Sequence, residues 1–156
     1  MKKIFSFALV AAIVAACSSE PHYVINGKIE GADSVMFLLQ KREAGVMVDL
    51  DSAMAYKGSF KMKGGSVIYP EMVLLSVRDS RMRTQFFLEN AEITITGKLD
   101  SLYGAVISGS KTHDEYSGFV KTIDDLSEQY TEVYNQYQIA AQEGDTAKAA
   151  QLEKQI

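Results

Sequence analysis

The chain of 156 residues carries 16 basic and 20 acidic side chains and has a formal net charge of −4. This acidic balance, without a cluster of Lys or Arg, argues against binding to nucleic acid and against electrostatic binding to anionic lipid. Cys17 is the only cysteine. A disulfide framework within the chain, a redox dithiol and a cysteine-based zinc site are therefore excluded.

The first sixteen residues have the pattern of a secretory signal. Lys2 and Lys3 precede an apolar stretch, residues 4–16, in which Ser6 is the only polar side chain. The stretch is shorter than the roughly 20 residues that a membrane-spanning helix needs. We therefore expect residues 1–16 to be a signal peptide and not a transmembrane helix.

Small residues stand directly before the cysteine. The sequence from Val14 to Cys17, with two alanines between them, looks like the lipobox of bacterial lipoproteins. The resemblance implies cleavage before Cys17, lipidation of its thiol and a protein held at a membrane by acyl chains. Ser18 implies, by the same resemblance, sorting to the outer membrane. Residues 17–22 are expected to form the lipidated linker. The alternative to a lipobox is a plain secretory signal in which the cysteine is incidental.

Residues 23–109 alternate between apolar and polar side chains, and turn residues interrupt them at short intervals. This pattern predicts an antiparallel β domain, either a β-sandwich or a partly open barrel of about eight strands. The expected strands lie near residues 23–31, 35–39, 46–57, 60–62, 72–77, 84–88, 93–95 and 105–107.

Glycines mark the tight turns of this domain. Gly45 predicts one hairpin turn and Lys57-Gly58 a second, because glycine tolerates the positive φ that such turns require. The strand between these two turns is long, so a bend or bulge is expected near Asp51 and Ser52. On the return strand, the side chains at positions 60 and 62 are expected to point inward.

The apolar spacing changes at Ser110 from two to about 3.6 residues, which predicts a helical segment over residues 110–156. Thr112 followed by Glu115 predicts a capping box at its start. The pattern then predicts one amphipathic helix that reaches Glu143 and is roughly 48 Å long at 1.5 Å per residue. Such a helix exceeds the width of a small domain, so its far half needs another partner.

Gly144 predicts the end of the long helix, and Asp145 is expected to cap a second helix. The second helix carries a thin apolar stripe and no stop signal. Two interpretations follow, a packed helical hairpin or a helix cut off before its natural continuation. The stripe consists of Ala149, Leu152 and Ile156.

A series of short motifs follows a fixed order from Tyr23 to Tyr116. They are Ile25 to Gly31, Asp51 to Ala53, Gly58 to Gly64, Pro70 with Glu71, Leu88 to Asn90, Ile93 to Ile95, Ser108 to Ser110, and Glu115 with Tyr116. Their order and spacing resemble a family of bacterial envelope lipoprotein domains, the domain-of-unknown-function family number 4369. In that family, helices and a thioredoxin-like domain of the peroxiredoxin or cytochrome-maturation type often follow. No Cys-x-x-Cys is present here, so the resemblance assigns redox activity to no residue.

Two groups of polar residues are candidates for hidden chemistry. Asp49 and Asp51 are expected to share a strand face, where such a pair usually serves solubility and less often binds a cation. His113, Asp114 and Glu115 resemble a ligand cluster, but acidic residues at a helix start also stabilise the helix dipole. The sequence contains no phosphate loop, nucleophile elbow or metal-spaced histidine pair. We therefore predict no catalytic residue, metal or cofactor, and no enzymatic activity.

Tyr130, Tyr134 and Tyr137 share one side of the long helix and either pack onto a neighbour or contact a partner or glycan. The favoured hypothesis is a lipid-anchored periplasmic lipoprotein with a non-catalytic binding or positioning role. It predicts a native end near Ile156 and helices folded back onto the sheet. The first alternative is the N-terminal domain of a truncated thioredoxin-like thiol–disulfide oxidoreductase lipoprotein, and the second is a glycan-binding sandwich. Expected partners are the membrane and either a thioredoxin-like domain or an envelope protein.

Overall fold

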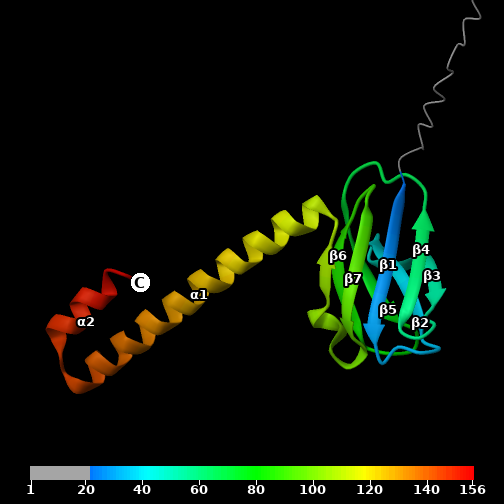
Figure 1. The fold of residues 1–156 in the computed structure, drawn as a ribbon. Coiled ribbons are helices and arrows are strands. Elements are labelled where there is room, and N and C mark those ends of the chain that lie inside the picture. The colour runs from blue at the N-terminus through cyan, green and yellow to red at the C-terminus, as the bar shows by residue number, and fades with distance from the viewer. Residues whose placement is uncertain (1–21) are drawn as a thin grey trace, which may run out of the picture.

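Two four-stranded sheets pack face to face, and a helical arm projects from one side of them (Figure 1). The computed structural model describes residues 22–156, so the signal peptide and Cys17 lie outside the described residues. The strand order is β4-β1-β7-β8 in one sheet and β3-β2-β5-β6 in the other. The predicted fold class, a β-sandwich of about eight strands followed by a helical hairpin, is confirmed.

The strands are β1 (Tyr23–Glu30), β2 (Met36–Glu43), β3 (Val46–Met54), β4 (Ser59–Gly64), β5 (Glu71–Val77), β6 (Arg83–Leu88), β7 (Glu92–Lys98) and β8 (Val106–Ser108). A 3₁₀ helix, η1 (Leu99–Gly104), connects β7 to β8. The arm consists of α1 (Lys111–Glu143) and α2 (Thr146–Glu153).

One strand pair departs from the antiparallel expectation. β1 and β7 run parallel, with Ile25 opposite Ile93 and Gly27 opposite Ile95, whereas the other pairs are antiparallel. The alternation of apolar side chains is the same in both directions, because side chains alternate along a strand whichever way its neighbour runs. The pattern therefore predicts the strands and leaves their relative direction open.

Alternate side chains from both sheets meet in the core. Phe37 of β2 and Phe60 of β4 stack with ring centroids 4.4 Å apart and join the two sheets. A Cβ at Gly27 of β1 would overlap the ring of Phe60, so only glycine leaves room for this contact. Phe60 and Met62 are buried, which confirms their predicted inward orientation. The largest other fully buried side chains are Phe86, Ile25, Ile29, Leu39, Leu75, Leu88, Ile93, Ile95, Leu102 and Val73.

Both predicted hairpin turns are confirmed. Ala44 and Gly45 have φ values of 48° and 84°, and Lys57 and Gly58 have φ values of 50° and 78°. Two successive residues with positive φ form the turn that matches the twist of the flanking strands. The second of these turns leads from β3 in one sheet to β4 in the other and so closes one side of the sandwich.

A β-bulge interrupts β3 close to the predicted position. Leu39 lies opposite Asp51 whereas Gln40 lies opposite Asp49, so Leu50 is the extra residue. Because Leu39 and Gln40 are consecutive on β2, their side chains point to opposite faces. The prediction that Asp49 and Asp51 share a face is therefore wrong. The bulge turns the side chain of Asp49 toward one face of the sheet and that of Asp51 toward the other.

The arm touches the sandwich through β6 and β8 and then extends away from it (Figure 1). At its far end, Gly144 adopts the left-handed conformation with φ of 75°, and Asp145 accepts a hydrogen bond from the N–H of Lys148 at 3.0 Å. The predicted helix end and second cap are thus confirmed. α2 folds back on α1, and Ala140 and Leu152 are buried between them. None of the helices between residues 22 and 156 combines the length and apolar character needed to cross a bilayer.

Two predictions about the arm are wrong. The helices do not fold back onto the sheet: hydrogen bonds from Thr112 to Glu89 hold the first turn of α1 at the β domain, and the rest of the arm extends away from it (Figure 1). The N-cap is Ser110, whose hydroxyl accepts from the N–H of His113 at 3.1 Å, and not Thr112. Thr112 bonds instead to a carboxylate of the β domain, and Glu115 lies 3.7 Å from the ammonium of Lys111. The helix is thus capped locally by Ser110, and Thr112 bonds to a tertiary partner.

Candidate binding groove

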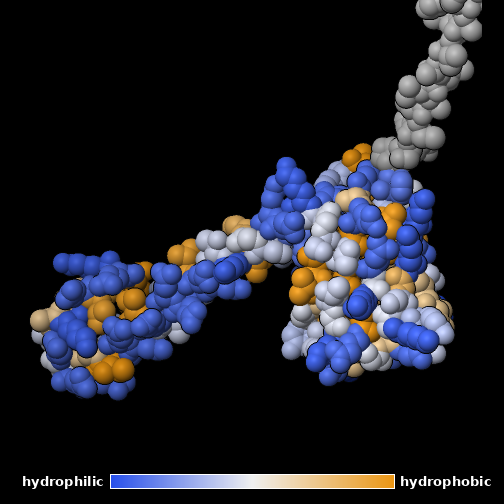
Figure 2. All heavy atoms as spheres, viewed as in Figure 1, coloured by the Kyte–Doolittle hydropathy of each residue, from blue (hydrophilic) through white to orange (hydrophobic). Residues whose placement is uncertain are grey.

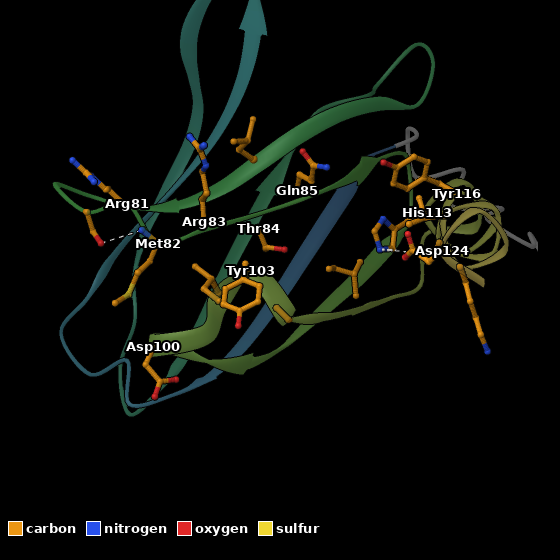
Figure 3. Close-up of a pocket in the computed structure, with 18 residues that line it drawn as sticks. Arg81, Met82, Arg83, Thr84, Gln85, Asp100, Tyr103, His113, Tyr116 and Asp124 are labelled. Atoms are coloured by element: carbon orange, nitrogen blue, oxygen red, sulfur yellow. Dashed lines mark hydrogen bonds between the residues drawn. The ribbon is translucent and has the colours of Figure 1, made fainter. Parts of the chain in front are cut away.

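A groove of about 900 Å³ lies where β6, η1 and the first turns of α1 meet (Figure 3). It occupies the open side of the sandwich. β6 and β8 are the end strands of the two sheets, and no strand among the described residues joins them. The walls include Arg83, Thr84 and Gln85 of β6, Tyr103 of η1, and His113 and Tyr116 of α1.

β6 presents a free backbone edge to this groove. The N–H of Val77 donates to the carbonyl of Met82 at 3.0 Å, which fixes the phase of the β5–β6 ladder. Residues of an antiparallel strand alternate between bonding to the neighbour and facing away. The backbone groups of Thr84 therefore face β5, and those of Arg83 and Gln85 face outward. Such an edge can accept another extended strand.

The side chains around the groove are mixed in character. Arg81, Arg83 and Lys121 supply positive charge, and Asp100 and Asp124 supply negative charge. Apolar surface comes from Tyr103 of η1, which is 83% exposed, and from Met82 in the loop before β6. No single charge dominates, so the groove is not built for a highly charged ligand such as a polyphosphate.

His113 combines burial with an unsatisfied nitrogen. Its Nδ1 is buried and has no hydrogen-bond partner among the described residues, and its Nε2 lies 3.2 Å from the hydroxyl of Ser117. Burial lowers the pKa of His113 below its ordinary value of 6.5, and the nearby charge of Asp114 opposes this only in part. A catalytic serine–histidine pair needs a carboxylate that orients Nδ1. That carboxylate is missing among the described residues, so the pair does not form a triad.

The two candidate clusters from the sequence are not assembled as sites. His113 faces the groove, whereas Asp114 and Glu115 are exposed on α1. Asp49 accepts a hydrogen bond from Gln40 Nε2 at 2.7 Å. Within residues 22–156, no three His, Cys, Asp or Glu side chains come together in a way that would hold a metal ion.

The three tyrosines of the sequence prediction lie on α1 beyond the groove, whose lining ends at Asp124. Tyr130 and Tyr134 stack with ring centroids 6.1 Å apart and an interplanar angle of 10°. Tyr134 and Tyr137 lie 6.4 Å apart, and the hydroxyl of Tyr134 accepts from Gln138 Nε2 at 2.9 Å. They form a continuous aromatic surface on the arm and take no part in the groove.

Glu89 connects the β domain to the arm. Its carboxylate accepts hydrogen bonds from the hydroxyl of Thr112 at 2.9 Å and from the N–H of Thr112 at 3.3 Å. Burial raises the pKa of Glu89, but hydrogen bonds from Thr112, Ser110 and the backbone outweigh it, so this pKa lies below its ordinary value of 4.5. A carboxylate at a helix N-terminus also interacts favourably with the helix dipole. This contact fixes the wall that α1 contributes to the groove.

Sequence reasoning missed the groove residues. Arg83, Gln85 and Tyr103 belong to no motif, and their role depends on which strand lies at the edge of the sheet. Glu89, at the β6–β7 corner, belongs to one of the motifs that resemble the family. Its hydrogen bond to Thr112, however, spans 23 positions of the chain. A local pattern carries no signal for either feature.

These features define a class by fold: a β-sandwich with an open strand edge and a helical arm. Residues 1–18 match the model for the prokaryotic membrane lipoprotein lipid attachment site, so the protein is anchored to the cell envelope through lipid. Residues 23–116, more than half of the chain, match the model described as Domain of unknown function (DUF4369), and the chain belongs to this family. The resemblance seen in the sequence is thus confirmed. Neither a curated protein nor a solved structure matches the chain significantly.

Proposed function

We propose that this lipoprotein is a non-catalytic binding protein that holds an extended polypeptide segment of another envelope protein in the β6 groove. The observation that carries the proposal is the free backbone edge of β6, which lines the groove. Strand addition to such an edge derives its affinity from main-chain hydrogen bonds. The side chains of the added strand would alternate between the two walls and supply specificity.

The character of the walls supports a polypeptide ligand. An added strand would pass between η1 and the first turns of α1, where both charge signs and aromatic rings are available. A peptide of ordinary composition presents both kinds of group. Tyr116 is held in place by an edge-to-face contact with Phe87 at 5.4 Å, so this wall is ordered before a ligand arrives.

We further propose that the protein works in the periplasm and that its anchor lies in the outer membrane. The lipid attachment site supports anchoring, and Ser18 after Cys17 supports the choice of membrane through its resemblance to sorting signals. The anchor restricts the groove to a layer next to the membrane. Ligands tethered to the same membrane then meet it at a raised effective concentration.

Two other functions have weaker support. The thiol–disulfide oxidoreductase alternative requires paired cysteines beyond Ile156, which translation of the following codons would reveal. The glycan-binding alternative is supported by the stacked rings of Tyr130 and Tyr134. It fails if alanine substitutions at these tyrosines leave retention on glycan columns unchanged.

A photo-crosslinker at Tyr103 tests the proposed function in cells. We expect an adduct with a polypeptide in the wild-type background and in Gln85→Ala, which keeps the backbone N–H that faces the free edge. Gln85→Pro removes this N–H without removing a β5–β6 hydrogen bond and should reduce the adduct at least about tenfold. A crosslinker at Tyr56, on the closed side of the sandwich, is the position control. An adduct that survives the proline, or no adduct from Tyr103, contradicts strand addition.

A further inference from the structure

Eight apolar or aromatic residues of α1 follow a heptad repeat. Their spacing alternates between three and four residues from Tyr116 to Ala140, which is the pattern of the a and d positions of a coiled coil. The a positions are Tyr116, Ile123, Tyr130 and Tyr137, and the d positions are Phe119, Leu126, Val133 and Ala140. We call this row of eight side chains the seam.

The middle of the seam is exposed. Phe119, Ile123, Leu126 and Tyr130 have exposed fractions of 64%, 45%, 55% and 51%. Orange patches lie on the arm between the sandwich and the far end of the arm (Figure 2). At the far end of the seam, α2 covers α1 and buries Ala140. The last turns of the seam are thus covered by α2, whereas its middle has no packing partner among the described residues.

The residues beside the seam carry no charge over the exposed stretch. Over this stretch, the acidic side chains of Asp124, Asp125 and Glu128 lie at b, c and f positions, which point away from a packed partner. Charges at e and g positions determine which helices pair. A different helix with charged flanks would find no opposite charge here, whereas a second copy brings equally neutral flanks. The e residues are Val120, Ser127 and Tyr134, and the g residues are Thr122, Gln129 and Gln136.

We propose that a second copy of this chain covers the seam, with the two α1 helices packed antiparallel as a coiled coil. The exposed part of the seam reads aromatic, aliphatic, aliphatic, aromatic in either direction, with Phe119 and Tyr130 outside and Ile123 and Leu126 inside. An antiparallel pair places a residues opposite d residues, so Ile123 meets Leu126 and Phe119 meets Tyr130 of the other copy. Tyr116, the first seam residue, already packs on Phe87 of the β domain. The antiparallel arrangement therefore also keeps the two β domains at opposite ends.

Membrane anchoring favours this association. Two copies held by lipid at one surface encounter each other at a higher effective concentration than two free proteins. The dimer buries the exposed aromatic and aliphatic side chains, each of which contributes hydrophobic free energy on burial. The acidic residues of the exposed stretch remain on the outer faces of both helices, so the contact buries no acidic side chain.

Cysteine crosslinking in native membranes tests the proposal. The full lipidated chain is co-expressed with two different epitope tags and treated with a short bismaleimide. Leu126→Cys lies near the two-fold axis and should yield a species that carries both tags. Glu128→Cys, on the opposite face of the same turn, should yield less than about one tenth as much. Phe119→Cys should not couple to its own counterpart, whereas a parallel pair would couple at both seam positions.

A charge variant provides the second measurement. Ile123→Glu, added to Leu126→Cys, places a carboxylate in the seam and should reduce coupling at least about tenfold. Because Ile123 is exposed in the single chain, this substitution leaves the fold intact.

Lys121→Glu adds an acidic residue to the face of α1 opposite the seam and should leave coupling unchanged. The chain without an added cysteine is the control for coupling through Cys17, the only native thiol. Absent coupling at Leu126→Cys, equal coupling at Glu128→Cys, or an adduct with only one tag and another protein overturns the proposal.

Discussion

The carboxylate of Glu89 and the hydroxyl of Thr112 form a hydrogen bond of 2.9 Å between the β6–β7 corner and the first turn of α1. The same carboxylate accepts the N–H of Thr112. Ser110, which is fully buried, caps the helix beside them. Three residues thus join a sheet to a helix that has little other contact with it. The direction of the arm and the shape of the groove depend on this joint.

Removal of the Glu89 carboxylate should weaken the joint. We expect Glu89→Ala to lower the free energy of unfolding by about 1 to 2 kcal/mol, because two hydrogen bonds to the helix start are lost. Glu89→Gln keeps an acceptor but loses the charge, so a smaller loss is expected. Urea unfolding followed by circular dichroism measures both. Equal stability of wild type and Glu89→Ala would contradict the role of this carboxylate.

The same group predicts a pH dependence. The pKa of Glu89 is lower in the folded protein than its ordinary value of 4.5, so the folded state binds its proton less readily than the unfolded state. Its stabilising contribution is complete above pH 4.5 and is lost as the pH falls through the folded pKa. The difference in stability between wild type and Glu89→Gln should therefore shrink on acidification. A difference that grows toward low pH would contradict the lowered pKa.

Gly109 should not tolerate a side chain. Its φ is 90°, and a Cβ there would overlap the carbonyl oxygen of Glu92. Gly109→Ala should cost more than about 2 kcal/mol of unfolding free energy, since it combines backbone strain with a clash. Gly118→Ala is the matched control, because a Cβ meets nothing within 4 Å at this helical position. It should stabilise the protein by about 0.5 to 1 kcal/mol through helix propensity. Thermal unfolding of both variants measures the contrast.

His113 should make the protein less stable at mildly acidic pH. Its pKa is lowered by burial, so below pH 6.5 the unfolded chain binds a proton that the folded protein resists. Stability should fall as the pH decreases from 6.5 toward the folded pKa of this group. His113→Gln lacks this titration and should lose less stability between pH 7 and pH 5, a range of about two units around the ordinary histidine pKa. NMR titration of the ring protons gives the pKa directly. A midpoint at or above the ordinary value would contradict the prediction.

Cys17→Ser should release the protein from the membrane fraction. The hydroxyl cannot receive the thioether-linked lipid, and no helix in residues 22–156 is suited to span a membrane. Fractionation with an antibody to the β domain measures the change, and mass spectrometry of the wild-type N-terminus detects the acyl chains. Ser18→Ala keeps the thiol and serves as the control. Unchanged membrane association of Cys17→Ser would show that another contact holds the protein there.

The periodicity of the sequence was a reliable guide to single elements. Alternating apolar residues, or short continuous apolar runs at residues 35–39 and 72–77, predicted the strands. Lys57-Gly58 and Gly144 predicted a turn and a helix end that the structure contains. These signals are local, because a turn residue or a helix cap acts on the few residues next to it. The capping box at Thr112 failed because Ser110 caps the helix two residues earlier and a distant carboxylate, that of Glu89, bonds to Thr112.

The sequence by itself determined the lipid attachment at the N-terminus, the alternation that builds a β-sandwich and the length of α1. Only the tertiary structure decided that β6 lies at a free edge, that β1 and β7 run parallel and that the arm points away from the sheets. Strand order and helix direction depend on contacts between residues far apart in the chain. A pattern within one segment records which side of that segment is apolar, and it does not record which other segment covers it.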